Sequence, residues 1–242
     1  MLKKLINYNT RDLPSHWYLT IILFVGLFAL QQLIVLGFNL GFIVNPILGL
    51  AIGVILIVLT IWILTQFKTV HEQIPFDQIH LTGNFVSLIA LTVIATYVLQ
   101  ITWALTARSA LQLNLNGKAS DNQNAIMTYF HHGTPAAIFM IILAVFVAPA
   151  IEEFIFRVLI IKPNPKVKYE SYRIIGSLLV FALAHVITQI NQIPWNSWCF
   201  YFGQYFFIGL CLTFIYCKHR NYRLNYLTHM TWNALSLVIA LV

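Results

Sequence analysis

The stretch that decides the fold is residues 136–160, AAIFMIILAVFVAPAIEEFIFRVLI, in which only Glu152, Glu153 and Arg157 are ionisable. A helix that crosses a bilayer needs about 20 mostly apolar residues, so this run predicts a transmembrane helix. An ionisable side chain at bilayer depth costs several kcal/mol and usually faces a polar interior. The run therefore predicts a functional site as well as a span.

The composition of the whole chain indicates a membrane protein. Of 242 residues, 60% are hydrophobic and 9% are charged, whereas soluble domains have about 25% charged residues. The sequence predicts a single all-α, polytopic membrane domain over residues 1–242, with a motif-bearing catalytic core at about 136–242. We expect about seven transmembrane helices, at residues 17–38, 47–67, 85–107, 136–160, 174–190, 198–217 and 225–242.

The lysines and arginines indicate how the bundle is oriented. With the N-terminus inside, eleven of them fall on the inner side, and only Arg108 and Lys118 fall on the outer side. This is a positive-inside asymmetry, so we expect a cytoplasmic N-terminus and an external C-terminus. It also explains the net charge of +7 without nucleic acid, because the basic residues lie between apolar stretches and form no groove-like patch.

The acidic residues and the histidines sort into loops and spans. Five of the seven acidic residues lie outside the predicted spans, which leaves Glu152 and Glu153 inside. Six of the eight histidines lie in loops or at span ends, which leaves His185 and His229 inside. A single histidine on an apolar helix is more often a hydrogen-bonded packing residue than a catalytic one. The joint occurrence of these groups with Arg157 favours a site.

Helical spacing assigns different tasks to the two glutamates. Glu153 and Arg157 are four residues apart, so they share a helix face and can form an ion pair. Glu152 is rotated by roughly 100° from Glu153 and is less well placed for Arg157. We therefore expect Glu153 and Arg157 to support the structure and Glu152 to be free to accept a proton. Pro149, one turn earlier, is expected to kink or open the helix beside the site.

Two further pairs predict that three helices converge on one polar cavity. Phe181 and His185 are four residues apart, as are His229 and Asn233, so each pair projects from one face of its helix. A water between Glu152 and His185 could be deprotonated for attack on a carbonyl carbon. His229 and Asn233 could then donate hydrogen bonds to the developing oxyanion. Phe181 is interpreted as a packing residue that shapes the cavity.

The same donors are also compatible with a metal. Two carboxylates and two imidazoles can bind zinc and leave a position open for water. The sequence has no HExxH helix, and the acidic and imidazole groups come from separate segments. The residues alone therefore do not exclude a metal and leave a zinc-dependent membrane protease open as an alternative.

Three short motifs in the sequence resemble those of a known protein family. Glu152 to Arg157 matches EExxxR, Phe181 to His185 matches FxxxH, and His229 to Asn233 matches HxxxN. In this order they resemble the CPBP family of intramembrane proteases, which includes the type II CAAX prenyl endopeptidases and the bacterial Abi proteins of bacteriocin processing and self-immunity. The resemblance implies a glutamate-dependent, metal-independent peptidase. It places Glu152 and His185 at the activated water, and His229 with Asn233 at the oxyanion.

The expected function is thus an intramembrane endopeptidase in the membrane of a bacterial cell. Its expected partners are the lipid bilayer and a peptide or protein substrate, either a CAAX-type or a bacteriocin-related peptide, and not nucleic acid. Two other classes are compatible with the residues. One is a non-enzymatic bacteriocin self-immunity protein, and the other is a proton-coupled transporter, for which paired intramembrane carboxylates are also suitable.

Overall fold

A computed structural model describes residues 17–67, 70, 83–113, 126–130, 133–161 and 167–241. The named elements of this part are all helices. The α-helices are α1 (Trp17–Val44), α2 (Pro46–Thr65), α4 (Gly83–Ala110), α6 (Thr134–Ile141), α7 (Ala148–Glu153), α8 (Val167–Val186), α9 (Trp195–His219) and α10 (Tyr222–Leu241). Two π-helical segments, η3 (Ile142–Val147) and η4 (Phe154–Leu159), flank α7, and the 3₁₀ turn η5 (Ile187–Gln189) follows α8.

The predicted spans all fall on helices, and the all-α polytopic fold is confirmed. Six helical stretches are long and apolar enough to cross a membrane, and the helix from α6 to η4 counts as one of them. The seventh predicted span, 225–242, corresponds to α10. It has 20 residues but does not reach the hydropathy of the other six within the described part of the chain. Its polar residues, which include His229, explain the difference.

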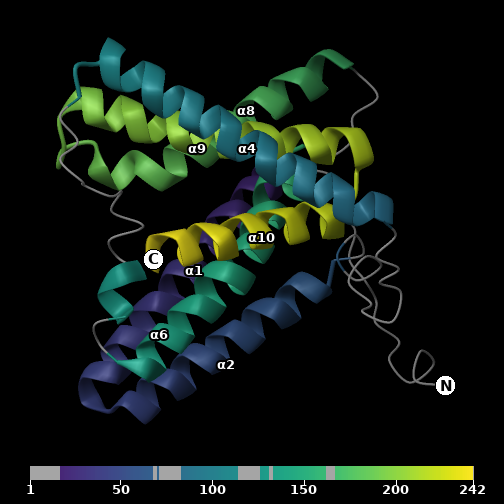
Figure 1. The fold of residues 1–242 in the computed structure, drawn as a ribbon. Coiled ribbons are helices and arrows are strands. Elements are labelled where there is room, and N and C mark those ends of the chain that lie inside the picture. Colours follow the sequence, from purple (N-terminus) through teal and green to yellow (C-terminus); the bar gives the residue numbers. More distant parts are fainter. Residues whose placement is uncertain are drawn as a thin grey trace.

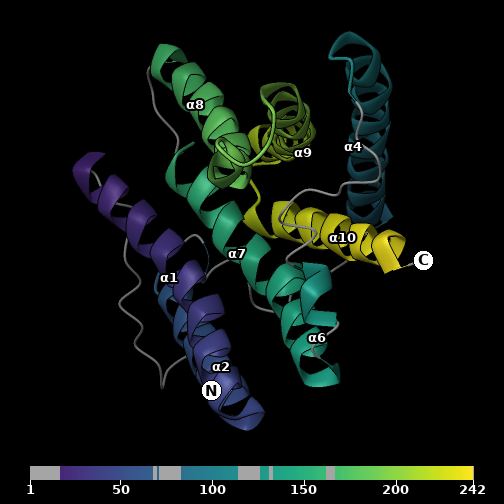
Figure 2. The ribbon, with the colours of Figure 1, turned by 90° about the vertical axis from the view of Figure 1, so that its left-hand side faces the viewer.

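The helices form two groups joined by α7 and α10. The helices α1 and α2 pack as a hairpin, and α6 lies against α2, whereas α8 and α4 both pack on α9. Figures 1 and 2 show these two groups on either side of α10, which contacts α4, α7 and α9. The helix carrying Glu152 and Glu153 therefore lies at the junction of the groups, where elements from both can reach it.

Close packing in the N-terminal hairpin depends on glycine. The N-terminus of α2 is capped by Asn45, whose side chain accepts a hydrogen bond from Ile47 N at 2.8 Å, and Pro46 occupies the first turn, where a missing N–H does no harm. A Cβ on Gly41 would lie 2.7 Å from the Cα of Gly49 on the facing helix. The backbones of α1 and α2 can approach this closely only because neither residue has a side chain.

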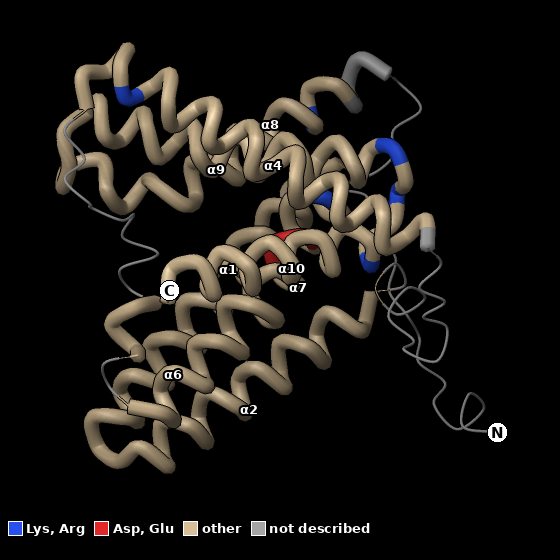
Figure 3. The backbone as a smooth tube through the Cα atoms, viewed as in Figure 1, with Lys and Arg blue, Asp and Glu red and all other residues tan. Residues whose placement is uncertain are grey.

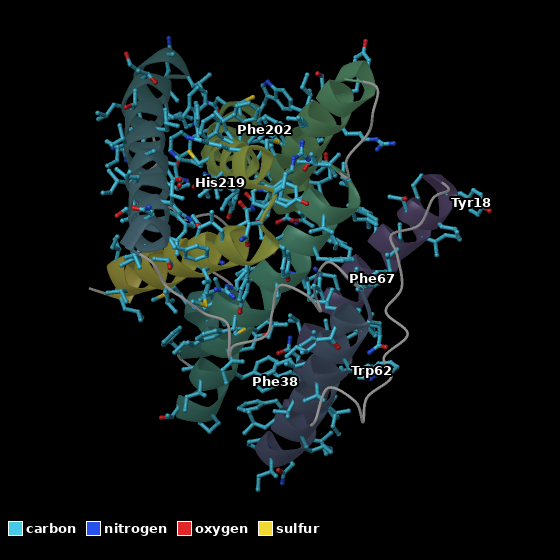
Figure 4. All side chains as sticks on the ribbon, turned by 90° about the vertical axis from the view of Figure 1, so that its right-hand side faces the viewer. Tyr18, Phe38, Trp62, Phe67, Phe202 and His219 are labelled. Carbon is cyan, nitrogen blue, oxygen red and sulfur yellow. The ribbon has the colours of Figure 1, made fainter. Side chains whose placement is uncertain are left out.

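The apolar core of the first group lies between this hairpin and α6. Phe38 is buried and stacks on Phe139 of α6, with ring centroids 3.9 Å apart. Figure 4 shows Phe38 and Phe67 on the side of the hairpin that faces the rest of the bundle. Tyr18 and Trp62, by contrast, are exposed, as expected for side chains that face lipid.

Charge is distributed unevenly along the bundle. Figure 3 shows most of the described basic residues near one end, whereas the acidic residues lie at the centre. Lys218 belongs to the last turn of α9, and Arg108 belongs to the last turn of α4. Much of the predicted asymmetry rests on side chains outside the described part, namely those of Lys3, Lys4, Arg11, Lys68, Lys118, Lys162, Lys166 and Lys168. The membrane orientation stays a prediction.

Candidate active site

The helix that carries the two glutamates is irregular on both sides of them. In η3 the N–H of Ala148 bonds to the carbonyl of Leu143, five residues back, and in η4 the N–H of Ile160 bonds to Ile155 O at 3.2 Å. Such π-helical turns occur frequently at functional sites. Pro149 lies directly after the first of them, so the opening of the helix expected at Pro149 is present as a change of hydrogen-bond register.

The side chain of Asn233 fills the gap that this proline leaves. In the π register the donor for Ala144 O would be the N–H of Pro149, which proline lacks. Asn233 Nδ2 donates to Ala144 O instead, at 2.8 Å. A carboxamide has a second N–H, so this bond still leaves Asn233 one donor. The contact also fastens α10 to the helix that bears the glutamates.

Glu153 is fully buried, and both of its carboxylate oxygens have partners. Oε1 lies 2.8 Å from Nδ1 of His229. Oε2 lies 3.4 Å from Nε of Arg157 and accepts a hydrogen bond from the side chain of Asn225. The ion pair predicted from the i, i+4 spacing is therefore present. A buried carboxylate with this many partners is a structural anchor, since buried charge is tolerated when it is paired and hydrogen-bonded.

Arg157 is also fully buried and lies among aromatic rings. Its guanidinium carbon is 4.7 Å from the ring centroid of Phe181, within the range of a cation–π contact. Nη2 lies 3.5 Å from Gly209 O. A Cβ on Gly209 would lie 2.9 Å from the Phe181 ring, so the glycine leaves room for the ring. Phe181 thus packs as expected, and its ring also contacts His185 with centroids 4.6 Å apart.

Glu152 has a different environment. Its side chain is 11% exposed, whereas that of Glu153 is 0% exposed. Its Oε2 lies 3.6 Å from Nε2 of His185 and 3.8 Å from Nε2 of His229. These separations are too long for direct hydrogen bonds but short enough for one water to contact all three atoms. The structure thus brings Glu152, His185 and His229 together from α7, α8 and α10, and Asn233 lies one turn further along α10.

The other ring nitrogen of each histidine sets the direction of its hydrogen bonds. Nδ1 of His185 lies 2.8 Å from the carbonyl of Phe181, which can only accept, so this nitrogen carries a proton. Nδ1 of His229 meets the carboxylate of Glu153 in the same way. Each neutral imidazole then has a lone pair on Nε2, and both Nε2 atoms face Glu152 Oε2.

Three contributors to the site were not predicted. Gln31 of α1 donates from Nε2 to Glu152 Oε1 at 3.2 Å, Asn225 binds Glu153, and Tyr205 of α9 stacks on His185 with centroids 4.4 Å apart. All three side chains are uncharged at neutral pH, so they stand out less in an apolar helix than a glutamate does. Asn225 had a signal, because it precedes His229 by four residues and so shares its helix face.

The zinc alternative can be compared with these distances. Zinc ligands bind at about 2.0–2.1 Å in a tetrahedron, which places their donor atoms about 3.4 Å apart. The separations at Glu152 Oε2 are larger, 3.6 and 3.8 Å. Among the residues that the structure describes, no group of three His, Cys, Asp or Glu residues has the arrangement of a metal site.

A surface groove lies away from this cluster. It has a volume of about 470 Å³ and runs between α4 and α10, lined by residues that include Val93, Leu227 and Leu235. No titratable side chain lines it. It is therefore an apolar surface feature of the kind that lipid chains fill, and it is separate from the cluster of ionisable side chains.

The fold and the cluster define a class: a polytopic membrane protein with a carboxylate and two imidazoles around a water-sized space. Comparison with known proteins agrees with this class. Residues 134–235 match the family of type II CAAX prenyl endopeptidase Rce1-like proteins, so this region of the chain is Rce1-like. The match confirms the resemblance drawn from the three motifs, and it begins close to the predicted core at residue 136.

One curated relative also shares sequence with this chain. The UPF0177 protein YvdC of Lactococcus lactis subsp. lactis (strain IL1403) is 36% identical to it over 92 residues. The aligned segment covers 38% of this chain and 31% of the relative, so the chain spans about a third of that protein's length. No solved structure matches the chain.

Proposed function

We propose that the protein is an intramembrane endopeptidase that hydrolyses a peptide bond with a water activated by Glu152 and His185. The observation that carries this proposal is the position of Glu152 Oε2 at 3.6 and 3.8 Å from two imidazole Nε2 atoms. A water in this space would contact a proton acceptor and two groups that orient it. The Rce1-like match over 134–235 supports the same class of reaction.

The reaction follows from the proton positions. To donate to the oxyanion, Nε2 of His229 must carry a proton, so the proposed reaction uses the imidazolium form of His229, with Nδ1 against Glu153. Glu152 takes a proton from the water, whose oxygen attacks the carbonyl carbon while Nε2 of neutral His185 orients it. His229 donates to the resulting oxyanion. When the intermediate collapses, the C–N bond breaks and Glu152 passes its proton to the leaving amine.

Asn233 completes the oxyanion site through its remaining N–H. One N–H is engaged with Ala144 O at 2.8 Å, so the amide plane is fixed by the main chain of η3. A fixed donor lowers the cost of reorganisation when charge develops on the substrate oxygen. Asn233 thus has a structural role, in its bond to η3, and an electrostatic role at the oxyanion. The bond to η3 fixes the amide that serves the oxyanion.

The substrate is a peptide or protein at or within the membrane, and a farnesylated CAAX peptide is the first probe because of the family description. We infer from the distribution of basic residues that the N-terminus lies on the cytoplasmic side, and we propose a bacterial cell membrane because the curated relative is bacterial. A bacteriocin-related peptide is the second probe. Both probes suit a site whose helices, apart from α10, are long and apolar enough to cross a membrane.

The test compares cells that produce wild-type protein with cells that produce Glu152→Gln. The variant should lose cleavage by about 10³-fold, since general-base catalysis contributes about 10²–10⁴-fold, and should remain inserted in the membrane. Peptide mass spectrometry of the two strains reads out activity and substrate together. Retained cleavage in Glu152→Gln overturns the proposal.

Histidine variants provide a matched control. His185→Gln should abolish cleavage, whereas His219→Gln, at an exposed position in the last turn of α9, should leave it unchanged. Strong chelation stops a zinc enzyme and leaves a glutamate enzyme active. Protection of cells that persists in both Glu152→Gln and His185→Gln identifies a non-enzymatic immunity protein, and uptake that follows a pH gradient identifies a transporter.

A further inference from the structure

Gln31 is the one described contact of the Glu152 carboxylate that comes from the N-terminal hairpin. Its Nε2 donates to Glu152 Oε1 at 3.2 Å, across 121 residues of sequence. The residue belongs to α1, which lies outside the segment 134–235 that matches the family. One contact of the site therefore comes from a region of the chain that the family match does not include.

The position of Gln31 on α1 is unusual for an amide. Leu27, Ile34 and Phe38, which lie four residues before and three and seven residues after it, are all buried in the core. Gln31 thus interrupts the apolar face with which α1 packs against the bundle. Burying an amide costs free energy unless its hydrogen bonds are satisfied. Its Oε1 is nevertheless buried without a hydrogen-bond partner among the described residues, so the bond to Glu152 is the one interaction that compensates this placement.

A hydrogen bond to only one carboxylate oxygen differentiates the two oxygens. The terminal torsion of glutamate is broad and roughly two-fold, so without a fixed partner the carboxylate plane of Glu152 would rotate readily. The bond from Gln31 holds Oε1 and leaves Oε2 facing His185 and His229 at 3.6 and 3.8 Å. An amide is also neutral, so it orients the carboxylate without neutralising it as a lysine or arginine would.

We propose that Gln31 is a positioning residue, which holds Glu152 Oε1 so that Oε2 is the atom that takes the proton from water. The proposal rests on the proposed peptidase function for its kinetic consequence. The hydrogen bond itself has a consequence that is independent of peptidase activity. A carboxyl that has lost its one amide donor turns more freely and becomes more accessible to a reagent.

The chain offers a matched control in the next residue. Gln32 carries the same side chain on the exposed face of α1, so Gln32→Leu makes the same chemical change without touching Glu152. Gln31→Leu should lower kcat on the order of tenfold, because the proton-accepting oxygen of Glu152 is no longer held in one orientation toward the water. KM should stay within about twofold, since Gln31 acts through Glu152 and not on the bound peptide. Gln31→Glu, which places a second carboxylate beside the first, should lower kcat further.

Two measurements are made on each purified full-length variant. The first is the kinetics of cleavage of the peptide found by the Glu152→Gln comparison. The second is the rate at which a hydrophobic carbodiimide modifies Glu152, followed by mass spectrometry. Gln31→Leu should be modified several-fold faster than wild type, and Gln32→Leu should match wild type in both measurements.

The outcomes separate the two proposals. If wild type and Glu152→Gln show the same peptide profile while Gln31→Leu alone is modified faster, the peptidase function fails and the positioning of Glu152 stands. If Gln31→Leu leaves both kcat and the modification rate unchanged, the positioning fails and the peptidase function stands. An equal loss of kcat in Gln31→Leu and Gln32→Leu, or a change in KM alone, also overturns the positioning role.

Discussion

The two neighbouring glutamates of α7 face environments that differ in one respect: how fully their oxygens are bound. Glu153 is buried against Arg157, Asn225 and His229 and has partners on both oxygens. Glu152 has one hydrogen bond, from Gln31, and one oxygen that faces two imidazoles beyond hydrogen-bond distance. The roughly 100° turn between consecutive helical residues directs these identical side chains to different neighbours.

The comparison shows how a membrane protein can keep one carboxylate reactive. A buried charge with no partner is unstable, and one with every lone pair occupied cannot accept a proton readily. Glu153 stabilises Arg157 and fixes the Nδ1 side of His229, so it prepares the imidazole whose Nε2 faces Glu152. Glu153, whose two oxygens both have partners, therefore supports Glu152 through His229, which lies beside both carboxylates. The predictions below test this division.

The largest effect on stability is expected from Glu153→Gln. The variant leaves Arg157 as a fully buried cation without its carboxylate partner, and breaking a buried pair in this way costs about 3–5 kcal/mol. Glu152→Gln should change the free energy of unfolding by only about 1 kcal/mol, since it removes a partly exposed charge with one hydrogen bond. Denaturant unfolding of the purified proteins, followed by tryptophan fluorescence, measures both. Equal destabilisation by the two variants would contradict the proposed division.

A smaller effect is expected from Asn225→Ala. This change removes one donor from the carboxylate of Glu153 but keeps both of its other partners, so the loss should be about 1–3 kcal/mol. Because Asn225 lies on the structural side of the site, kcat should fall only slightly in molecules that remain folded. A kcat that drops as far as in His185→Gln would assign Asn225 to the chemistry instead. Tyr222→Phe is a suitable comparison, since it removes a hydrogen bond that α10 donates to Ala150 O.

The sequence was sufficient for the helices and for the groups that meet at the centre. Long apolar runs predict membrane helices directly, and the sorting of ionisable residues singled out Glu152, Glu153, Arg157, His185 and His229. The i, i+4 rule also predicted the Glu153–Arg157 pair, which lies at 3.4 Å. These predictions succeed because charge at bilayer depth is expensive and helical spacing is fixed by geometry.

The neutral polar contacts could not be predicted in the same way. Gln31 and Asn225 carry no charge, so they stand out less at bilayer depth than a glutamate does. The four-residue spacing of Asn225 and His229 indicates a shared helix face but not a partner, and the partners of Gln31 and Asn225 lie 121 and 72 residues away. The π-helical segments depend on which carbonyls find donors in the folded bundle, so Pro149 predicted an irregularity but not its register. The bond from Asn233 to Ala144 O follows only from that register.

The smallest effect on stability is expected from Asn233→Ala. This variant tests whether Asn233 serves the helix alone or the reaction as well. The loss of the donor leaves the carbonyl of Ala144 without the bond that replaces the missing N–H of Pro149, which should cost about 1 kcal/mol. If Asn233 also donates to the oxyanion, kcat should fall about 10²-fold or more, far beyond what this loss of stability explains. Asn233→Asp removes both bonds as well and adds repulsion toward Ala144 O and toward the oxyanion, so it should lower both stability and kcat further than Asn233→Ala does. A loss of kcat of about 10²-fold or more in the folded molecules of Asn233→Ala would establish that Asn233 serves the reaction as well as the helix. A kcat that falls only in proportion to the folded fraction would restrict Asn233 to its structural bond.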